Sequence, residues 1–382
     1  KTRGSDRAGT LRTGGLDSRA VVACSDRPLV TLTLGDFENR EVEIARRIAD
    51  VAGCRHVFLR RPLDHYPNLV QEAVRIGDGM YRFDHAHVIG LLDEARTHCD
   101  VLLDALHFDS SFKGSHLVYD QCSVLGRHFY LPMLAELSDP DSLETWRKIR
   151  GFRSSAEVAG LLSPRYGRML DESLFSSLRA AGVGATADKA QDVVEYPMAR
   201  LLGFKGSHLM ALAVRSRMPQ RSVIADNDLW SLSLSMPPPL RAKGRVLKKA
   251  LKKLSPTLAA MPYSNTGLRA DLPVWPEWLV VSSRKWLRET GVLPPPRLAH
   301  PAFTNGSWPN FGELIRVDGQ ILRLIGDTLH DPACIDPDLF NVPAATAILQ
   351  RHLEGKQDAA ELLFRLLTFG RWHKAYGPAT LP

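Results

Sequence analysis

Residues 9–104 alternate short apolar runs, rich in β-branched residues, with segments whose apolar positions recur at helical spacing. The runs predict strands at 9–12, 28–34, 55–59 and 100–104. The segments between them predict helices at 20–24, 39–51, 69–76 and 88–98. Such alternation implies right-handed crossovers, so we predict an α/β fold with a parallel, doubly wound sheet. Ligands of these sheets bind beyond the carboxyl ends of strands, where the strand order reverses.

Beyond about residue 125 the strand patterns fade, and helical patterns dominate. Residues 262–312 are rich in Pro, Trp and Asn, so we predict irregular structure there. We expect a single domain over residues 1–382, with an α/β nucleotide-binding core at 1–125 and a mainly helical part at 126–382. The helices expected in the second part are 143–149, 155–162, 171–180, 198–214, 227–234, 244–254, 344–353 and 358–375.

The composition is that of an ordinary globular protein, with 44% hydrophobic and 24% charged residues among 382. No apolar run approaches the ~20 residues that a membrane-spanning helix needs, and we predict no membrane partner. The five cysteines are scattered without a Cys-x-x-Cys pair, which argues against a zinc site or a disulfide framework. We therefore expect a cytoplasmic protein.

The net charge of +7 raises the question of a nucleic-acid partner. Much of the excess is local, because residues 241–253 hold seven basic residues and no acidic ones. The chain has no aromatic-rich RNA motif, no zinc-finger spacing and no basic low-complexity tail. A nucleic-acid partner is therefore not the reading that the sequence favours.

The stretch Thr13-Gly-Gly-Leu-Asp-Ser-Arg19 stands between the first expected strand and helix. Its glycines let the backbone approach a bulky anion, and the amides that open a helix favour phosphate. Asp17 would repel a bare phosphate, so its presence suggests a Mg²⁺ between the carboxylate and the phosphate. The alternative is an ordinary turn with an Asp or Ser helix cap. The stretch resembles the Ser-Gly-Gly-x-Asp-Ser pyrophosphate loop of the ATP pyrophosphatases, with Thr13 replacing the first Ser.

A second candidate site is the segment Leu103–Gly114, which runs from an expected strand into a polar turn. By itself it could be a loop with a capping Asp. Together with two earlier segments, however, it resembles the synthetase domain of the asparagine synthetase family. That family has a Thr-Phe-Thr-Phe-Gly-like strand, an Arg-Glu-Val-Glu-Ile-Ala helix and a Gly-Gly-Asp-Glu-Leu-Phe-Gly-Gly segment. The counterparts here are Thr31-Leu-Thr-Leu-Gly35, Arg40-Glu-Val-Glu-Ile-Ala45 and His107-Phe-Asp109-Ser-Ser-Phe112-Lys-Gly114.

The resemblance continues downstream in the same order, so that it covers nearly the whole chain. The matching segments are Asp226-Asn-Asp-Leu229, Met236-Pro-Pro-Pro-Leu240, Lys248-Lys-Ala-Leu-Lys252 and Leu366–Tyr376. It implies the fold of the adenine nucleotide α-hydrolases and an ATP-dependent, AMP-forming amide synthetase, that is, a ligase that forms C–N bonds. A carboxylate would be adenylated with release of pyrophosphate, and ammonia or an amine would then displace AMP.

The resemblance also assigns site residues. Asp17 and Asp109 would hold Mg²⁺, and Asp109 and Lys248 would be catalytic. For Lys248 the alternative is a solvated helix face, and Arg245 is the second choice for its role. His85 and His87 could suggest a metal but more often pack as ordinary side chains. The residues assigned to ATP are Thr13, Gly14, Gly15, Leu16, Asp17, Ser18, Leu34 and Gly35.

Three departures from the family pattern bear on the activity. His107 and Phe108 stand where the family has Gly-Gly, so bulky side chains could block backbone approach to the nucleotide. Ser110 replaces a Glu and removes a carboxylate. Leu106 stands where asparagine synthetases carry a Glu tied to aspartate activation, which puts aspartate specificity in doubt.

The implied substrate is a small-molecule or peptide carboxylate. The glutaminase domain of the glutamine-dependent members is not expected here. Ammonia would come from a separate glutaminase subunit or from solution, or a peptide amine would replace it. Two alternatives stay open: a cyclase that closes a lactam, as in lasso-peptide or β-lactam-forming relatives, and a degenerate, non-catalytic member that binds nucleotide or a protein partner. An RNA-binding or RNA-modifying pyrophosphate-loop protein is a more distant alternative.

Overall fold

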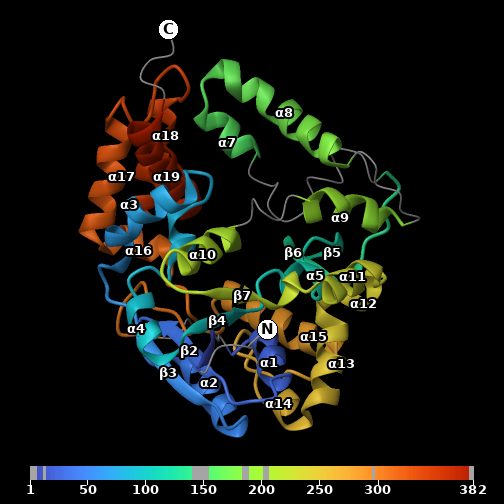
Figure 1. Cartoon of the computed structure of the whole chain (residues 1–382). Coiled ribbons are helices and arrows are strands. Elements are labelled where there is room, and N and C mark those ends of the chain that lie inside the picture. The colour runs from blue at the N-terminus through green and yellow to red at the C-terminus, as the bar shows by residue number, and fades with distance from the viewer. Residues whose placement is uncertain are drawn as a thin grey trace.

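The computed structural model describes residues 7–11, 14–139, 155–182, 189–200, 206–294 and 297–377. Within these residues, five parallel strands form one sheet in the order β3-β2-β1-β4-β7 (Figure 1). The strands are β1 (Ala8–Leu11), β2 (Val30–Gly35), β3 (Arg55–Arg60), β4 (Val101–Asp104) and β7 (Gln220–Ser222). The order runs outward from β1 to β3 on one side and from β1 to β4 on the other. The strand order therefore reverses between β1 and β4, which is where such sheets bind ligands.

Successive side chains of a strand point to opposite faces of the sheet, and helices pack against both faces of this one. In β4, Val101 and Leu103 pack with Val21 and Val22 of α1 (Leu16–Ala23). Leu102 points the other way, into a core shared with α3 (His65–Gly77), α4 (Leu92–His98) and α10 (Gly206–Arg215). On the first face α2 (Arg40–Val51) packs beside α1. The predicted doubly wound α/β fold is confirmed.

The C-terminal helices extend the core that contains α3, and they gather around it at the opposite end of the molecule from α14 (Figure 1). Phe83 donates a backbone hydrogen bond of 3.1 Å to the Thr368 hydroxyl, which ties this layer to the short helix η1 (Phe83–Ala86). The helices of this group are α16 (Phe311–Val317), α17 (Gly319–His330), α18 (Val342–Leu353) and α19 (Ala360–Tyr376). The predictions at 344–353 and 358–375 are confirmed, whereas α16 and α17 were not predicted.

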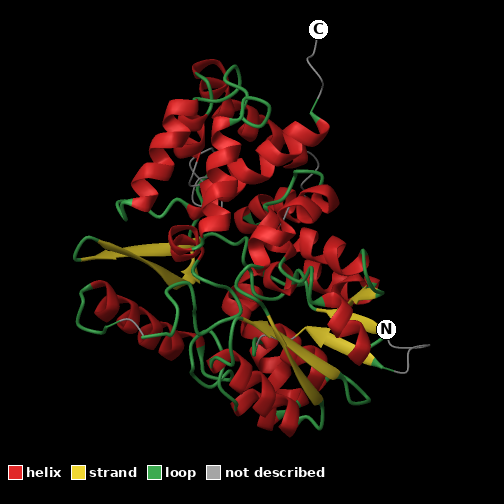
Figure 2. Ribbon diagram, turned by 90° about the vertical axis from the view of Figure 1, so that its left-hand side faces the viewer, coloured by secondary structure: helices red, strands yellow, loops and turns green. Residues whose placement is uncertain are grey.

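The prediction that strands end near residue 125 was wrong. A separate hairpin joins β5 (Tyr119–Val124) to β6 (Arg127–Leu134), and Figure 2 shows it apart from the main sheet. Its turn residues Leu125 and Gly126 both have positive φ, 50° and 74°. A hairpin turn of this kind usually carries Asn or Asp at the position that Leu125 occupies, so the sequence pattern was hidden.

Strand β7 was missed because it is only three residues long. Its place in the sheet is fixed by Asp104 at the end of β4, whose carboxylate accepts from Gln220 Nε2 at 2.8 Å and from Ser222 Oγ at 2.9 Å. These contacts join positions more than a hundred residues apart, so no local pattern predicts them.

The segment 262–312, predicted to be irregular, contains the 16-residue helix α15 (Val274–Glu289). Its sequence is rich in Trp and Val, which favour strands over helices. Trp278 donates from its indole nitrogen to the backbone oxygen of Tyr130 at 2.7 Å and so anchors α15 to β6. Tertiary packing therefore overrides local propensity here.

The remaining predictions in the second part fall largely on observed helices. The helix expected at 143–149 lies outside the described residues, as do residues 201–205 of the one expected at 198–214. In the described part of the chain, no helix is long and apolar enough to cross a membrane. The other helices are α5 (Phe108–Ser111), α7 (Ser155–Leu161), α8 (Pro164–Gly182), α9 (Ala190–Arg200), η3 (Val223–Ala225), α11 (Asn227–Ser235), α12 (Pro238–Arg241), η4 (Ala242–Gly244), α13 (Arg245–Leu254) and α14 (Pro256–Ala260).

Candidate active site

The glycine stretch forms the turn between β1 and α1, as predicted. Gly14 has φ of 64°, in the left-handed region that favours glycine, and Gly15 is the N-cap of α1 without a side-chain cap. Two buried polar atoms at the start of α1, Asp17 Oδ1 and Ser18 Oγ, have no hydrogen-bond partner among the described residues. Thr13 lies outside the described residues. Unsatisfied buried polar atoms beside an uncapped helix start are features of a ligand site.

Arg19 holds a distant segment over this turn. Its buried guanidinium donates to the backbone oxygens of Leu258, Met261 and Pro262 at 2.9, 3.0 and 2.7 Å, and to that of Gly14 at 3.0 Å. Burial lowers the pKa of Arg19 to about 10. These bonds bring Tyr263 and Ser264 beside the glycine turn, and Ser264 donates its backbone N–H to Gly14 at 3.3 Å.

Asp109 lies on α5, which follows β4 across the switch point from α1. His107, the N-cap of α5, has φ of 70°. The chain therefore keeps, with a histidine, a backbone conformation that glycine adopts more readily. The crevice at the switch point brings Asp17 and Asp109 together as the sequence predicted.

A residue that the sequence analysis did not select lies between the two carboxylates. The ammonium of Lys113 is 2.7 Å from Asp17 Oδ2 and also forms an ion pair with Asp109 Oδ1. Burial raises the pKa of Asp17 to about 6, Lys113 opposes this shift and Asp109 adds to it. Lys113 occupies a position that is Gly in the resembled segment, and that difference was the available sequence signal.

The cation position between the two carboxylates is thus taken by an amino group. Mg²⁺ prefers carboxylate and phosphate oxygens at about 2.1 Å. Here both carboxylates already have an oxygen committed to Lys113. In the described residues, no group of three or more His, Cys, Asp or Glu side chains could hold a metal ion. The donor set, as it is arranged, does not fit the predicted magnesium site.

Two cavities adjoin at Asp109, Lys113 and Tyr263, which line both of them. The first, of about 420 Å³, also borders Gly15 and Asp17 and is called the loop-side cavity below. The second, of about 380 Å³, also borders Lys248 and is called the lysine-side cavity. The three shared residues therefore form the boundary between a space on the glycine turn and a space on α13.

Lys248 is buried, unlike Lys249, Lys252 and Lys253 on the same helix, which are exposed. Its ammonium donates to the backbone oxygen of Leu272 at 3.0 Å and forms an ion pair with Glu277 of α15. The alternative of a solvated helix face is therefore wrong for this position. The charged residues that line the lysine-side cavity are three lysines and two acids: Lys113, Lys243, Lys248, Asp109 and Glu277.

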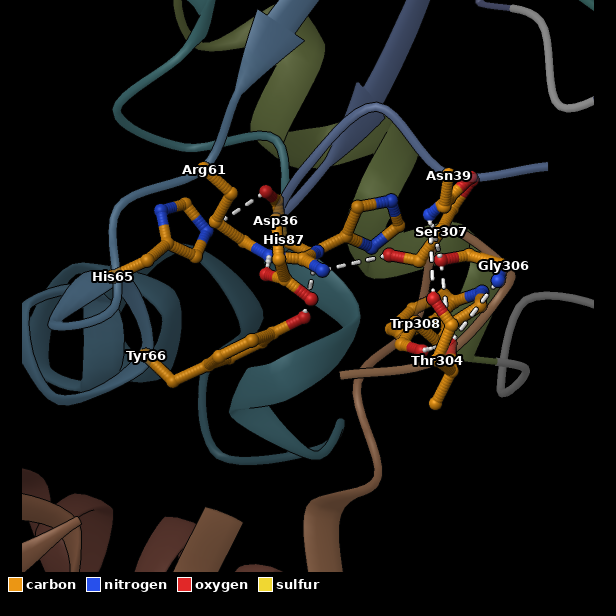
Figure 3. A network of polar contacts seen from close by, with 10 residues as sticks. All are labelled: Asp36, Asn39, Arg61, His65, Tyr66, His87, Thr304, Gly306, Ser307 and Trp308. Carbon is orange, nitrogen blue, oxygen red and sulfur yellow. Dashed lines mark hydrogen bonds and ion pairs between the residues drawn. The ribbon is translucent and has the colours of Figure 1, made fainter. Parts of the chain in front are cut away.

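The far wall of the loop-side cavity is the segment 304–308, which is tied to the carboxyl ends of β2 and β3 (Figure 3). Asn39 Nδ2 donates to the backbone oxygen of Gly306 at 2.9 Å, while its Oδ1 caps α2. Ser307 donates its N–H and its hydroxyl to Glu41 Oε2 at 2.6 and 2.9 Å. The buried Arg61 donates to Asp36 Oδ1, to the Tyr66 hydroxyl and to the backbone oxygen of Ser307.

Leu34 and Gly35, assigned to ATP by resemblance, end β2 next to this network. Leu34 is buried in the core, and the backbone oxygen of Gly35 accepts from Arg61 N at 2.8 Å. Neither residue lines the two cavities. His87 packs edge-on against Trp308, with ring centroids 4.1 Å apart. This aromatic contact gives His87 a packing role behind the cavity wall.

The five cysteines are free thiols. In a comparison with protein families, the model described as asparagine synthase matches residues 1–259. No curated protein matches the chain. The matched region includes the glycine turn, α5 with Asp109, Lys113 just beyond α5, and α13 with Lys248. Tyr263, Glu277 and the segment 304–308 lie beyond the matched region.

Proposed function

Because this chain belongs to the asparagine synthase family, whose members are ATP-using amide synthetases, we propose that it forms an amide from a carboxylate and an amine. In the proposed reaction a carboxylate oxygen attacks the α-phosphorus of ATP, and the bond to the β-phosphate oxygen breaks with release of pyrophosphate. The amine then attacks the acyl carbon of the acyl-adenylate, loses a proton, and AMP leaves.

The observation that carries this proposal is the junction of the two cavities at Asp109, Lys113 and Tyr263. The loop-side cavity contains the uncapped start of α1, where backbone amides favour phosphate. The lysine-side cavity contains three lysines, which suit a carboxylate, together with Asp109 and Glu277, the acids that pair with two of them. A nucleotide in the first and a carboxylate in the second would meet at the boundary, so that positioning supplies much of the rate.

Roles for the individual residues follow from their places. The amides of Gly15 and Leu16 and the unpartnered hydroxyl of Ser18 would bind phosphate oxygens, together with Gly14. The family resemblance assigns Thr13 to the same role. Lys248 would neutralise charge that develops between carboxylate and phosphate. Asp109 would orient Lys113 at the boundary. The backbone of Leu34 and Gly35 would contact the rest of the nucleotide. No magnesium step enters the proposal, because Lys113 occupies the place between Asp17 and Asp109.

The lining of the lysine-side cavity indicates the class of carboxylate. Its lysines share the cavity with apolar and aromatic side chains, which would contact an apolar body behind the carboxylate. A short polar substrate such as aspartate would leave this wall without a partner. The apolar lining consists of Leu16, Pro132, Val274, Trp278 and Val281.

The test is release of pyrophosphate from ATP in the presence of ammonia and a panel of carboxylic acids. The panel contains aspartate, acids with aliphatic or aryl bodies, and peptides with a free carboxylate. We expect turnover with the apolar acids or peptides, and its loss in Asp109→Asn. Intramolecular condensation of a single substrate would identify a cyclase.

Calorimetry with ATP separates failure of the chemistry from failure of the site. Binding of ATP without pyrophosphate release from any acid would identify a non-catalytic nucleotide-binding member, and the proposed synthetase activity would be wrong. Absence of ATP binding would overturn the nucleotide site itself. The control is Lys249→Met, which should keep ATP binding and turnover, because Lys249 is exposed and lines neither cavity.

A further inference from the structure

The amino group of Lys113 joins two carboxylates that come from opposite sides of the switch point. Asp17 belongs to the helix after β1, and Asp109 belongs to the helix after β4. Lys113 lies four residues beyond Asp109, a spacing at which the two side chains can meet, and its ammonium forms an ion pair with that carboxylate. The contact with Asp17 spans 96 residues of sequence. The ammonium therefore bridges the two acids at the point where the two cavities meet.

Backbone hydrogen bonds and packing hold Lys113 in place, in addition to its ion pairs. Its backbone N–H donates to Phe108 at 3.1 Å, and its backbone oxygen accepts from the Tyr119 hydroxyl at 3.4 Å. Its side chain is 19% exposed. The stem runs past Gly244, where an added Cβ would approach Lys113 Cγ to 3.2 Å. Gly244 thus leaves the space that the lysine stem fills.

A divalent ion and this ammonium exclude each other. An ion that bound Asp17 Oδ2 and Asp109 Oδ1, the two oxygens that the ammonium contacts, would lie about 2.1 Å from each of them. The ammonium already lies 2.7 Å from Asp17 Oδ2, so the two cations would be nearly in contact and would repel strongly. Only one of the two cations can bind Asp17 Oδ2 and Asp109 Oδ1 at the same time.

From this geometry we infer that Lys113 is a tethered cation that replaces a protein-bound divalent ion in the nucleotide site. The inference rests on the proposed function, because it assigns the group that faces the phosphates. The nucleotide then meets the Lys113 ammonium at the boundary of the cavities. A divalent ion that ATP carries from solution keeps only phosphate oxygens and water as ligands. Asp17 and Asp109 act as positioning residues for the amine.

The first experiment measures Mn²⁺ binding to the full chain without nucleotide, from the decrease in the electron paramagnetic resonance signal of the free ion. We expect the wild-type protein to leave that signal unchanged. Lys113→Ala removes the ammonium and uncovers both carboxylates, so it should bind one Mn²⁺ per chain. Adding Asp109→Asn to Lys113→Ala should abolish the new site, and Lys249→Ala should behave as wild type.

The second experiment measures ATP affinity by calorimetry in Mg²⁺ and in EDTA. Removal of the divalent ion should change the affinity of the wild type by less than about threefold, but that of Lys113→Ala by about tenfold or more. Circular dichroism checks that Lys113→Ala is folded, and Lys113→Gln serves in both experiments if it is not.

Wild-type binding of Mn²⁺ that Asp109→Asn abolishes would overturn the inference, and so would a Lys113→Ala protein that gains no Mn²⁺ site. If no variant binds ATP under either condition, the proposed function fails. The Mn²⁺ titration still decides whether Lys113 excludes a divalent ion, so the two failures are distinguishable.

Discussion

Arg61 Nη2 donates a hydrogen bond of 2.8 Å to the backbone oxygen of Ser307, although 246 residues separate the two in the chain. The same guanidinium pairs with Asp36 and reaches the Tyr66 hydroxyl, and its side chain is fully buried. It therefore joins the carboxyl end of the sheet to the segment that walls the loop-side cavity (Figure 3).

Replacing this arginine should cost stability, because Arg61→Met leaves the Asp36 carboxylate buried without its partner. We expect the free energy of unfolding to fall by about 3–5 kcal/mol, measured by urea denaturation. The matched control is Arg46→Met, whose ion pair with Glu38 is exposed and should contribute less than about 1 kcal/mol. Equal losses in the two variants would contradict the structural role given to Arg61.

Gly14 and Gly53 form a matched pair for testing the glycine turn, because their φ values are 64° and 63°. An alanine Cβ at Gly14 would approach Ser264 Cβ to 2.9 Å, whereas at Gly53 nothing lies within 4 Å. Gly53→Ala should cost only the left-handed backbone strain of about 1–2 kcal/mol. Gly14→Ala should cost more and should also weaken ATP binding. Denaturation and calorimetry check the two effects, and an unchanged ATP affinity would count against the turn as a phosphate site.

We expect Lys248 to contribute to the rate of the reaction as well as to the stability of the fold. Lys248→Met leaves Glu277 unpaired, so we expect lower stability together with a fall of about a hundredfold or more in pyrophosphate release. Lys248→Met combined with Glu277→Gln removes the unpaired charge and should recover stability without recovering activity. Recovery of both in the double variant would show that Lys248 acts only through folding.

His65 should make the protein less stable in weak acid. Its Nε2 lies 2.9 Å from the backbone oxygen of His87, and burial, with a further contribution from Arg61, lowers the pKa of His65 to about 4. The unfolded chain takes up a proton near pH 6.5 and the native state does not until about pH 4. Stability therefore falls as the pH drops through this window, by up to about 3 kcal/mol from this group.

The check is urea denaturation at pH 7 and at pH 4.5 for the wild type and for His65→Gln, which keeps a donor near His87. The variant should lose less stability between the two pH values than the wild type. An equal loss would assign the pH dependence to other groups, of which the buried His87 is the first to test, because burial lowers its pKa as well.

The sheet up to β4 was predictable, because its signals are local. Leu32, Leu34 and Leu59 fall in apolar runs, and the stripe of α2 follows helical spacing. Strand β7 was not predictable from three residues, because what fixes it is Asp104 across the sheet. Helix α15 was hidden for a related reason, since Trp278 and its contact with Tyr130 outweigh the propensity of its sequence.

The sequence by itself determined the strand, turn and helix at the glycine stretch, because turn geometry and helix starts depend on neighbouring residues. It also showed which acids lie near that turn in the chain. Only the tertiary structure decided what those acids face. Lys113 reaches Asp17 across the switch point, and Lys248 is buried while its neighbours on α13 are exposed. Side-chain charges interact through space over a few ångströms, so their partners depend on which strand ends the fold brings together.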